Sequence, residues 1–329
     1  MQLDLTSPLS IGPVTLPNRV FLAPMSGVSD APFRALSAEY GAGLVVSEMV
    51  AGELLARGDR EAGLRAERVG QGPHVVQLAG REGRWMAEGA RAAADAGADI
   101  VDINMGCPAK KVTGGYSGSA LMRDLDHALK LIEATVAAVD LPVTLKMRLG
   151  WDDSTINAPE LARRAEAAGV QMITVHGRTR CQFYTGHANW DAVCAVKAAV
   201  SIPLVVNGDI GSVADARRAL AASGADAVMI GRASYGRPWL PGRIAKAIAT
   251  GGAAADPDGT ELHDLIVRHY EALIAHYGTH TGHKVARKHL GWYLPDLSPA
   301  LRSAMMASDD PRTVLRLIGE AFAARSEAA

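Results

Sequence analysis

One short segment of the chain places a thiol where it could transfer a proton. In residues 104–108 (NMGCP) an apolar run ends, Gly106 permits a sharp bend, and Pro108 fixes the backbone directly after Cys107. A thiol with an ordinary pKa of about 8.5 is mostly protonated at neutral pH, so Cys107 could act as a general acid. The same pattern also allows a buried core cysteine or a covalent nucleophile.

Two other polar side chains stand at the ends of apolar runs. Lys146 closes the run 143–147, and a cation there suits an electron-rich ring that becomes anionic on reduction. His176 closes the run 172–176 and could donate to the same ring or to a substrate. The alternatives are a lysine paired with an acid such as Glu48 and a purely structural histidine.

Glycine-containing turns follow two later apolar runs, in residues 207–212 (NGDIGS) and 231–233 (GRA). Glycine lets backbone N–H groups approach a ligand closely, and each turn opens a helix whose N-terminus favours an anion. Arg232 adds a positive charge. The turns therefore predict a phosphate site, although two tight turns capped by polar residues would give the same pattern.

The runs that carry these residues alternate with Ala-rich helical stretches. Each run is continuously aliphatic, as in parallel strands buried on both faces, and we expect strands at residues 19–24, 44–49, 74–79, 99–104, 143–148, 172–176, 204–207 and 227–231. This alternation predicts a (β/α)8 TIM barrel, since no Gly-x-Gly-x-x-Gly follows an early strand as a doubly wound dinucleotide-binding sheet would require. Residues 9–16, around Gly12, predict a small hairpin that closes the bottom of the barrel.

In such a barrel the active site lies at the C-terminal ends of the strands. The candidate residues are therefore the ones that follow each apolar run, namely Met25, Ser26, Glu48, Gln77, Asn104, Lys146, Arg148, His176, Asn207, Gly208, Asp209, Gly231 and Arg232.

The character of the sequence changes after residue 250. Residues 251–257 (GGAAADP) have the composition of a linker. Beyond them only helical periodicity remains, with apolar residues at i, i+3 and i+4 from Leu262 to Tyr277. We therefore expect two domains, a catalytic barrel over residues 1–250 and a small all-helical domain over residues 256–329.

Composition excludes several classes of protein. Apolar residues make up 48% and charged residues 21% of the 329 residues, which excludes a disordered chain. The 34 basic and 35 acidic side chains nearly cancel, so any nucleic-acid surface must be local. The 3 cysteines fit neither a disulfide framework nor a zinc pattern, and we expect Cys194 to lie in the core. With no apolar run of about 18 residues and no signal-peptide pattern at the start, we expect a cytoplasmic protein that is neither membrane-bound nor metal-dependent.

Several segments together resemble the tRNA-dihydrouridine synthase family. They are residues 22–34 (LAPMSGVSDAPFR), 47–49 (SEM), 104–112 (NMGCPAKKV), 146–151 (KMRLGW), 176–180 (HGRTR), 207–210 (NGDI) and 229–232 (MIGR). Residues 286–293 (ARKHLGWY) are similar to the helical domain of the bacterial B-type members. Each string is weak alone, but together they cover the barrel in order and are highly specific.

The resemblance implies an enzyme that uses FMN and NADPH to reduce a uridine in the tRNA D-loop to 5,6-dihydrouridine, at position 17 for a B-type member. Hydride would pass from N5 of the flavin to C6 of uracil, and Cys107 would protonate C5. The implied cofactor-binding residues are Pro24, Met25, Ser26, Gln77, Lys146, His176, Asn207, Gly208, Asp209, Gly231 and Arg232. The implied contacts to the uridine come from Asn104, Arg148 and Arg178.

Binding of tRNA then requires a basic patch. Lys284, Arg287 and Lys288 share one face of a helix around residues 283–294, and a second cluster of arginines lies between residues 57 and 68. Either could instead be an ordinary solvated charged face. We expect a monomer. The rival hypotheses are an FMN barrel acting on a free pyrimidine or similar small molecule, a non-catalytic tRNA-binding protein, and a phosphate-binding barrel without flavin.

Overall fold

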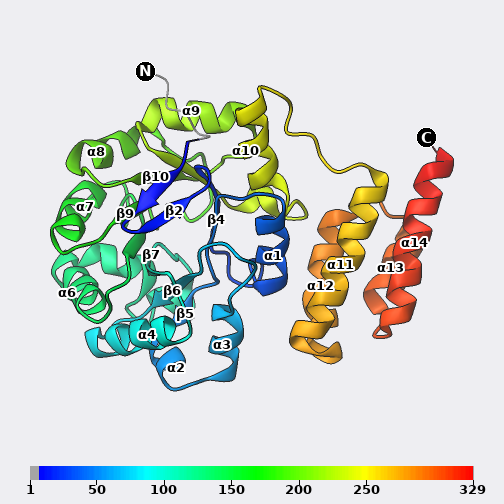
Figure 1. Cartoon of the computed structure of the whole chain (residues 1–329), viewed down its shortest axis with the longest axis horizontal. Helices are drawn as coiled ribbons and strands as arrows, with labels where there is room; N and C mark the ends of the chain where they lie inside the picture. The colour runs from blue at the N-terminus through cyan, green and yellow to red at the C-terminus, as the bar shows by residue number, and fades with distance from the viewer. Residues whose placement is uncertain (1–6, 329) are drawn as a thin grey trace.

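The computed structural model describes residues 7–328, with side chains as far as residue 323, and consists of a barrel from which a group of C-terminal helices projects to one side (Figure 1). The sheet of the barrel is parallel, in the order β4-β3-β11-β10-β9-β8-β7-β6-β5. Its strands are β3 (Val20–Leu22), β4 (Leu44–Val45), β5 (Val50–Ala51), β6 (Val75–Ala79), β7 (Ile100–Met105), β8 (Val143–Arg148), β9 (Met172–His176), β10 (Leu204–Asn207) and β11 (Ala227–Ile230). A parallel bridge between Val46, which follows β4, and Val75 of β6 closes this sheet, so the predicted (β/α)8 barrel is confirmed.

The second strand of the barrel is interrupted, which the prediction of one strand over residues 44–49 missed. Strand β4 pairs with β3, whereas β5 pairs with β6. Between them the Ser47 hydroxyl accepts a hydrogen bond of 2.9 Å from the backbone N–H of Gln77. A side chain thus replaces part of the backbone ladder, and the chain is free to bring Met49 to the wall of a cavity at the mouth of the barrel.

Helices cover the outside of the sheet, and aliphatic side chains fill the space between the two layers. The covering elements are α1 (Ala31–Glu39), α2 (Gly52–Ala56), α3 (Arg60–Ala66), α4 (Gly83–Asp95), α5 (Lys110–Thr113), η1 (Gly118–Arg123), α6 (Leu125–Val136), α7 (Ala158–Ala167), α8 (Asp191–Ala199), α9 (Val213–Ser223), η2 (Arg232–Ser234) and α10 (Leu240–Thr250). Local sequence sets their ends. Helix α9, for example, begins where the Ser212 hydroxyl accepts from the Asp215 N–H at 3.0 Å and ends at Gly224, whose φ is +66°.

The predicted hairpin closes the bottom of the barrel. Strands β1 (Leu9–Ile11) and β2 (Val14–Leu16) pair antiparallel. Their side chains Leu9, Ile11 and Leu16 are buried in one cluster with residues that begin the barrel strands, such as Val75 and Ile100. The hydrophobic plug leaves the opposite end, where the strands terminate, as the open mouth.

Four helices follow the barrel, namely α11 (Gly259–Tyr277), α12 (Thr279–Tyr293), α13 (Pro299–Ala307) and α14 (Pro311–Ala328). They share an apolar cluster with Leu36 and Trp239 of the barrel, and this cluster includes the predicted stripe residues Leu265, Ile266 and Leu273 of α11. Residues 251–258 contain no helix or strand. Within residues 7–328, no helix is both long enough and apolar enough to cross a bilayer.

The helices dock on the barrel beside its mouth. The Trp292 ring of α12 stacks on Tyr235, which follows η2, with ring centroids 4.5 Å apart and planes within 16°. Gly236 has a φ of +65°, and a Cβ there would lie 2.7 Å from the Trp292 backbone, so only glycine allows this approach. The Tyr277 hydroxyl of α11 also donates to Asp30, the N-cap of α1, at 3.3 Å.

Candidate active site

A cavity of about 700 Å³ opens at the C-terminal ends of the barrel strands. This volume is typical of sites for cofactors and small molecules. Most of the residues predicted for the site line it, namely Pro24, Met25, Ser26, Gln77, Asn104, Cys107, Lys146, Arg148, His176, Asn207, Gly208, Asp209, Gly231 and Arg232.

Lys146 presents a buried cation to this cavity. Its Nζ donates to Oδ1 of Asn207 at 3.1 Å, and the Asn207 amide is itself fixed by donating to the Met229 carbonyl at 2.8 Å. Glu48, the alternative partner of Lys146, instead accepts from the backbone N–H of Gly27. Burial, followed by the charge of Arg148, lowers the pKa of Lys146 to about 8, so the side chain is still mostly protonated at neutral pH.

The Cys107 segment is held by its neighbours rather than by regular structure. Oδ1 of Asn104 accepts from the backbone N–H of Cys107 at 2.9 Å, and the Ser119 hydroxyl donates to the Cys107 carbonyl at 2.8 Å. Gly118, with a φ of +60°, lets η1 approach, because a Cβ there would lie 2.8 Å from the Cys107 carbonyl oxygen. Burial raises the pKa of Cys107 above its ordinary value, so the half-buried thiol keeps its proton at neutral pH.

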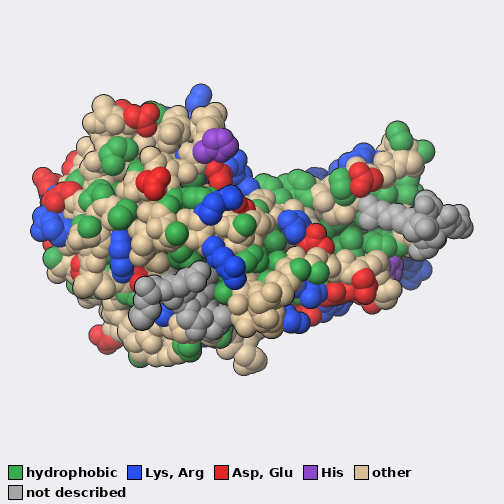
Figure 2. Space-filling view, turned by 90° about the horizontal axis from the view of Figure 1, so that it is seen from above, with side chains coloured by type: hydrophobic (Ala, Val, Ile, Leu, Met, Phe, Trp, Pro, Cys, Tyr) green, Lys and Arg blue, Asp and Glu red, His purple; other side chains and the backbone are tan. Residues whose placement is uncertain are grey.

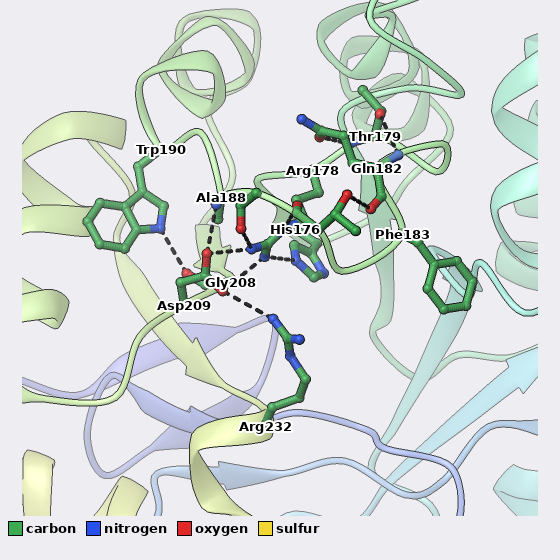
Figure 3. A network of polar contacts seen from close by, with 12 residues as sticks. His176, Arg178, Thr179, Gln182, Phe183, Ala188, Trp190, Gly208, Asp209 and Arg232 are labelled. Carbon is green, nitrogen blue, oxygen red and sulfur yellow. Dashed lines mark hydrogen bonds and ion pairs between the residues drawn. The ribbon is translucent and has the colours of Figure 1, made fainter.

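Arg178 lies behind the cavity wall and is not one of its lining residues. Its guanidinium donates to both carboxylate oxygens of Asp209, at 3.0 and 2.6 Å, and Arg232 donates to the same carboxylate at 3.2 Å (Figure 3). Burial alone would raise the pKa of Asp209, but the hydrogen bond from Arg178 and those that accompany it hold that pKa below 3.8. Arg178 therefore positions Asp209, whose φ is +54°, and its own side chain is only 1% exposed.

His176 completes this network as a neutral ring. Its Nε2 lies 3.3 Å from Nη1 of Arg178 (Figure 3). A guanidinium can only donate, so this Nε2 accepts and the ring proton resides on Nδ1. Burial first, and then the surrounding cations, lower the pKa of His176 well below 6.5.

Arg148 lines the cavity, but most of its N–H groups donate hydrogen bonds to backbone carbonyl oxygens. Nε donates to the Gly106 carbonyl at 2.8 Å, and Nη1 donates to the carbonyls of Thr179 and Phe183 at 2.9 and 2.8 Å. Arg148 thus ties the loop that carries Cys107 to the loop that follows β9.

Sequence reasoning missed an aromatic edge of the cavity. Phe183 and Tyr184 line it, each 42% exposed. The Tyr184 ring also stacks against the Arg232 guanidinium, whose Cζ lies 4.7 Å from the ring centroid. The sequence feature that could have identified this edge is an aromatic pair in an otherwise polar loop, directly after the strand that ends at His176.

The expected basic patch on α12 is only partly exposed. Lys284 is exposed, with Nζ 2.8 Å from Nε2 of His280, whereas Arg287 forms an ion pair of 2.9 Å with Asp309. Lys288 is half-buried, beside Gly27 of the barrel. The three side chains therefore do not present one free cationic face.

The second cluster and the cysteines also differ from expectation. Arginines 57, 65 and 68 form ion pairs with Glu53, Glu61 and Asp99, as in an ordinary charged surface. Cys194 is exposed on α8, so its expected place in the core is wrong. Among the described side chains, no group of three or more His, Cys, Asp or Glu residues is arranged to hold a metal ion.

The donor set of the cavity fits a flavin nucleotide. Ala23, Pro24 and Met25 provide an apolar wall for a ring system, and Lys146 faces the same space. Next to this wall, residues 208–211 and 231–232 bring glycine backbone and the Arg232 side chain to one place, a combination suited to a phosphate group.

Comparison with known proteins agrees with this arrangement. A model of the dihydrouridine synthase (Dus) family matches residues 21–327. The chain is 58% identical over 301 residues, 90% of its length and 93% of the relative's, to a probable tRNA-dihydrouridine synthase of Rhizobium leguminosarum bv. phaseoli. It is 56% identical to one of Rhodobacter capsulatus, covering 97% of this chain and 99% of that one. It is 46% identical to tRNA-dihydrouridine synthase B of Xanthomonas campestris pv. campestris, covering 95% and 96%.

Solved structures share the fold at much lower identity. Morphinone reductase superposes with a TM-score of 0.55 at 17% identity, over 79% of this chain and 93% of that one. An old yellow enzyme homologue from Zymomonas mobilis gives 0.54 at 16% identity, over 78% and 96%. These likenesses show the barrel fold alone. The match of the family model over almost the whole chain and the identity to curated relatives confirm the resemblance found in the sequence: this chain belongs to the dihydrouridine synthase family.

Proposed function

We propose that this protein uses bound FMN and NADPH to reduce a uridine of the tRNA D-loop to 5,6-dihydrouridine. The observation that carries the proposal is the meeting of Cys107, Lys146 and the two glycine turns at one cavity, in a chain of the dihydrouridine synthase family. The likeness to a relative named tRNA-dihydrouridine synthase B supports position 17 as the target.

The bound flavin would supply the hydride that adds to C6 of uracil. Glycines 208 and 231, with Arg232, are the groups that we assign to the phosphate. Lys146 is assigned to the ring, where its ammonium would stabilise negative charge that develops during electron transfer. Because Asn207 accepts from Nζ, the ammonium is held in one place before any ligand arrives.

Cys107 is assigned as the acid. Its S–H bond would break as the proton passes to C5 of uracil, which leaves a thiolate that takes its proton back from solvent. A raised pKa suits this role, because the thiol remains protonated until it is needed. Arg148 and Asn104 both hold the backbone around Cys107, so they would set the direction of the S–H bond.

A uridine inside folded tRNA must leave its stack to reach such a cavity. The exposed rings of Phe183 and Tyr184 at the rim are suited to receive unstacked bases. We assign the chemistry to the barrel, residues 1–250, and tRNA binding to the helices of residues 256–329. Lys and Arg side chains lie around the junction of these two parts on the face shown in Figure 2.

The decisive experiment is Cys107→Ala. The variant should remain yellow and oxidise NADPH but lose nearly all dihydrouridine formation in unmodified tRNA, measured by mass spectrometry. Cys194→Ala, at an exposed thiol on an outer helix, is the matched control and should behave as the wild type. Normal tRNA modification by the Cys107 variant would remove the assigned acid, and turnover of free pyrimidines but not of tRNA would favour the small-molecule rival.

A further inference from the structure

A chain of hydrogen bonds runs beneath the cavity from a buried carboxylate to the backbone of Cys107. Nε2 of Gln77 donates to Oδ2 of Asp102 at 2.7 Å. Nδ2 of Asn104 donates to Oε1 of Gln77 at 2.8 Å, and Oδ1 of Asn104 accepts from the Cys107 N–H at 2.9 Å. The chain crosses from β7 to β6 and back, and its three side chains are at most 7% exposed.

The two ends of this chain determine how both amides point. A carboxylate is an acceptor only, and a backbone N–H is a donor only. Gln77 must therefore turn its NH2 group toward Asp102, which leaves its oxygen for Asn104. Asn104 must then turn its NH2 group toward Gln77, which leaves its oxygen for Cys107. No other arrangement of the two amides satisfies both ends.

We propose that Asp102 is a positioning residue for Cys107 and acts through the polarity of this chain. The carboxylate fixes Gln77, Gln77 fixes Asn104, and Asn104 holds the N–H at the start of the Cys107 loop. The consequence for uridine reduction rests on the proposed function, whereas the link from Asp102 to the Cys107 thiol does not.

The burial of Asp102 supports this role. A carboxylate that is only 5% exposed is costly unless it is well bonded; burial raises its pKa, and the hydrogen bonds from Thr144 and Gln77 and the charge of Lys146 oppose that rise. The Thr144 hydroxyl donates to its Oδ1 at 2.6 Å. An asparagine would fill the same volume at lower cost, but its NH2 group could face Gln77 and reverse the chain. Only the acceptor-only carboxylate excludes that reversal.

The test is Asp102→Asn. With Thr144 still donating to the new amide oxygen, the amide NH2 group faces Gln77, both downstream amides reverse, and an NH2 group meets the Cys107 N–H. The loop then loosens, and the pKa of Cys107 falls toward its ordinary value. We expect alkylation of Cys107 by iodoacetamide at neutral pH to become about threefold faster, because a larger share of the thiol is then ionised. The exposed Cys181 and Cys194, followed in the same digest by mass spectrometry, should react at unchanged rates.

A second substitution should restore the polarity. In Asp102→Asn with Asn104→Asp, the acceptor-only group lies at the Cys107 end, Gln77 reverses, and every donor again meets an acceptor. We expect the double variant to recover the slow alkylation of Cys107 and to melt at a higher temperature than either single variant. The control is Thr144→Val, which removes a hydrogen bond from the same carboxylate without changing the polarity and should leave the alkylation rate as in the wild type.

Wild-type alkylation in Asp102→Asn, no recovery in the double variant, or an equal effect of Thr144→Val would each overturn the proposal. If Asp102→Asn does not fold, the test compares the melting temperatures of the double variant and of Asn104→Asp alone. Reversal of the chain predicts that adding Asp102→Asn to Asn104→Asp raises the melting temperature. Wild-type protein that does not modify tRNA would instead count against the proposed function and leave the thiol measurements as they stand.

Discussion

Arg178 and Asp209 form a doubly hydrogen-bonded ion pair in which the guanidinium side chain is 1% exposed and the carboxylate side chain 26%. The same carboxylate accepts from the Ala188 N–H at 2.8 Å. Arg178, which lies behind the cavity wall, therefore neutralises the negative charge of Asp209. The turn of residues 207–212 can still attract an anion on its cavity side, although Asp209 is part of it.

Removing Arg178 should damage both stability and anion binding. Arg178→Ala leaves Asp209 beside the assigned phosphate position without its buried partner, and breaking such a pair costs about 3 kcal/mol. We expect a lower melting temperature and at least about tenfold weaker FMN binding by fluorescence titration. Arg163→Ala breaks an exposed pair with Glu160 on α7 and should change neither quantity measurably. Equal FMN affinity in the Arg178 variant would contradict the neutralising role.

The pH dependence of uridine reduction should report the Cys107 thiol. Burial raises the pKa of this thiol, and the assigned step requires the protonated form. The rate of tRNA reduction by pre-reduced enzyme should therefore stay level through neutral pH and fall only in the alkaline range. Single-turnover rates at saturating tRNA measure this directly. A decline centred below pH 8.5 would assign the limiting proton to another group.

Lys146 should make stability rise with pH. Burial lowers its pKa from 10.5 to about 8, so between these values the unfolded chain binds more protons than the folded one. The free energy of unfolding contributed by this group therefore increases from pH 8 to 10.5. Relative to Lys146→Met, the wild type should gain about 2 kcal/mol between pH 7 and 10, as measured by urea unfolding. Parallel pH profiles for the two proteins would show that the ammonium is not desolvated.

Substitutions of Lys284 and Lys288 in the expected basic patch should affect different properties, namely tRNA binding and thermal stability. Lys284→Ala, at an exposed side chain, should weaken tRNA binding about twofold to fourfold and reduce the slope of log affinity against log salt by up to about 1. Lys288→Ala should mainly lower the melting temperature, because Lys288 is half-buried near the acidic side chains of Asp30 and Glu48. Lys130→Ala, exposed on α6, is the control for nonspecific loss of charge. An unchanged salt slope in the Lys284 variant would place the RNA elsewhere.

Much of the barrel could be predicted from the sequence because its strands are buried on both faces and read as aliphatic runs. Residues 143–148, 172–176 and 204–207 form strands with the predicted bounds. The break in the second strand could not be predicted, since it depends on the Ser47 hydroxyl meeting the backbone of a residue 30 positions away. Cys194 was misplaced because an Ala- and Val-rich helix has an exposed face as well as a buried one.

Much of the candidate site could be predicted from the rule that the active site of a TIM barrel lies at the C-terminal ends of its strands. That rule brought Gln77, Lys146 and Asn207 to one cavity from distant parts of the chain. It could not show which groups pair. Arg178 meets Asp209 only in the folded barrel, and Asp102, two residues before Asn104, reads in sequence as one polar residue inside a strand.

The stacking of Tyr235 on Trp292 has a mechanical consequence. Tyr235 lines the cavity, while Trp292 belongs to α12. If binding of a large ligand tilts the C-terminal helices, the movement would be transmitted through this pair of rings to the wall of the cavity. Grafting the helices of another relative onto this barrel would therefore alter the shape of the cavity unless the graft brings an indole to the same spot.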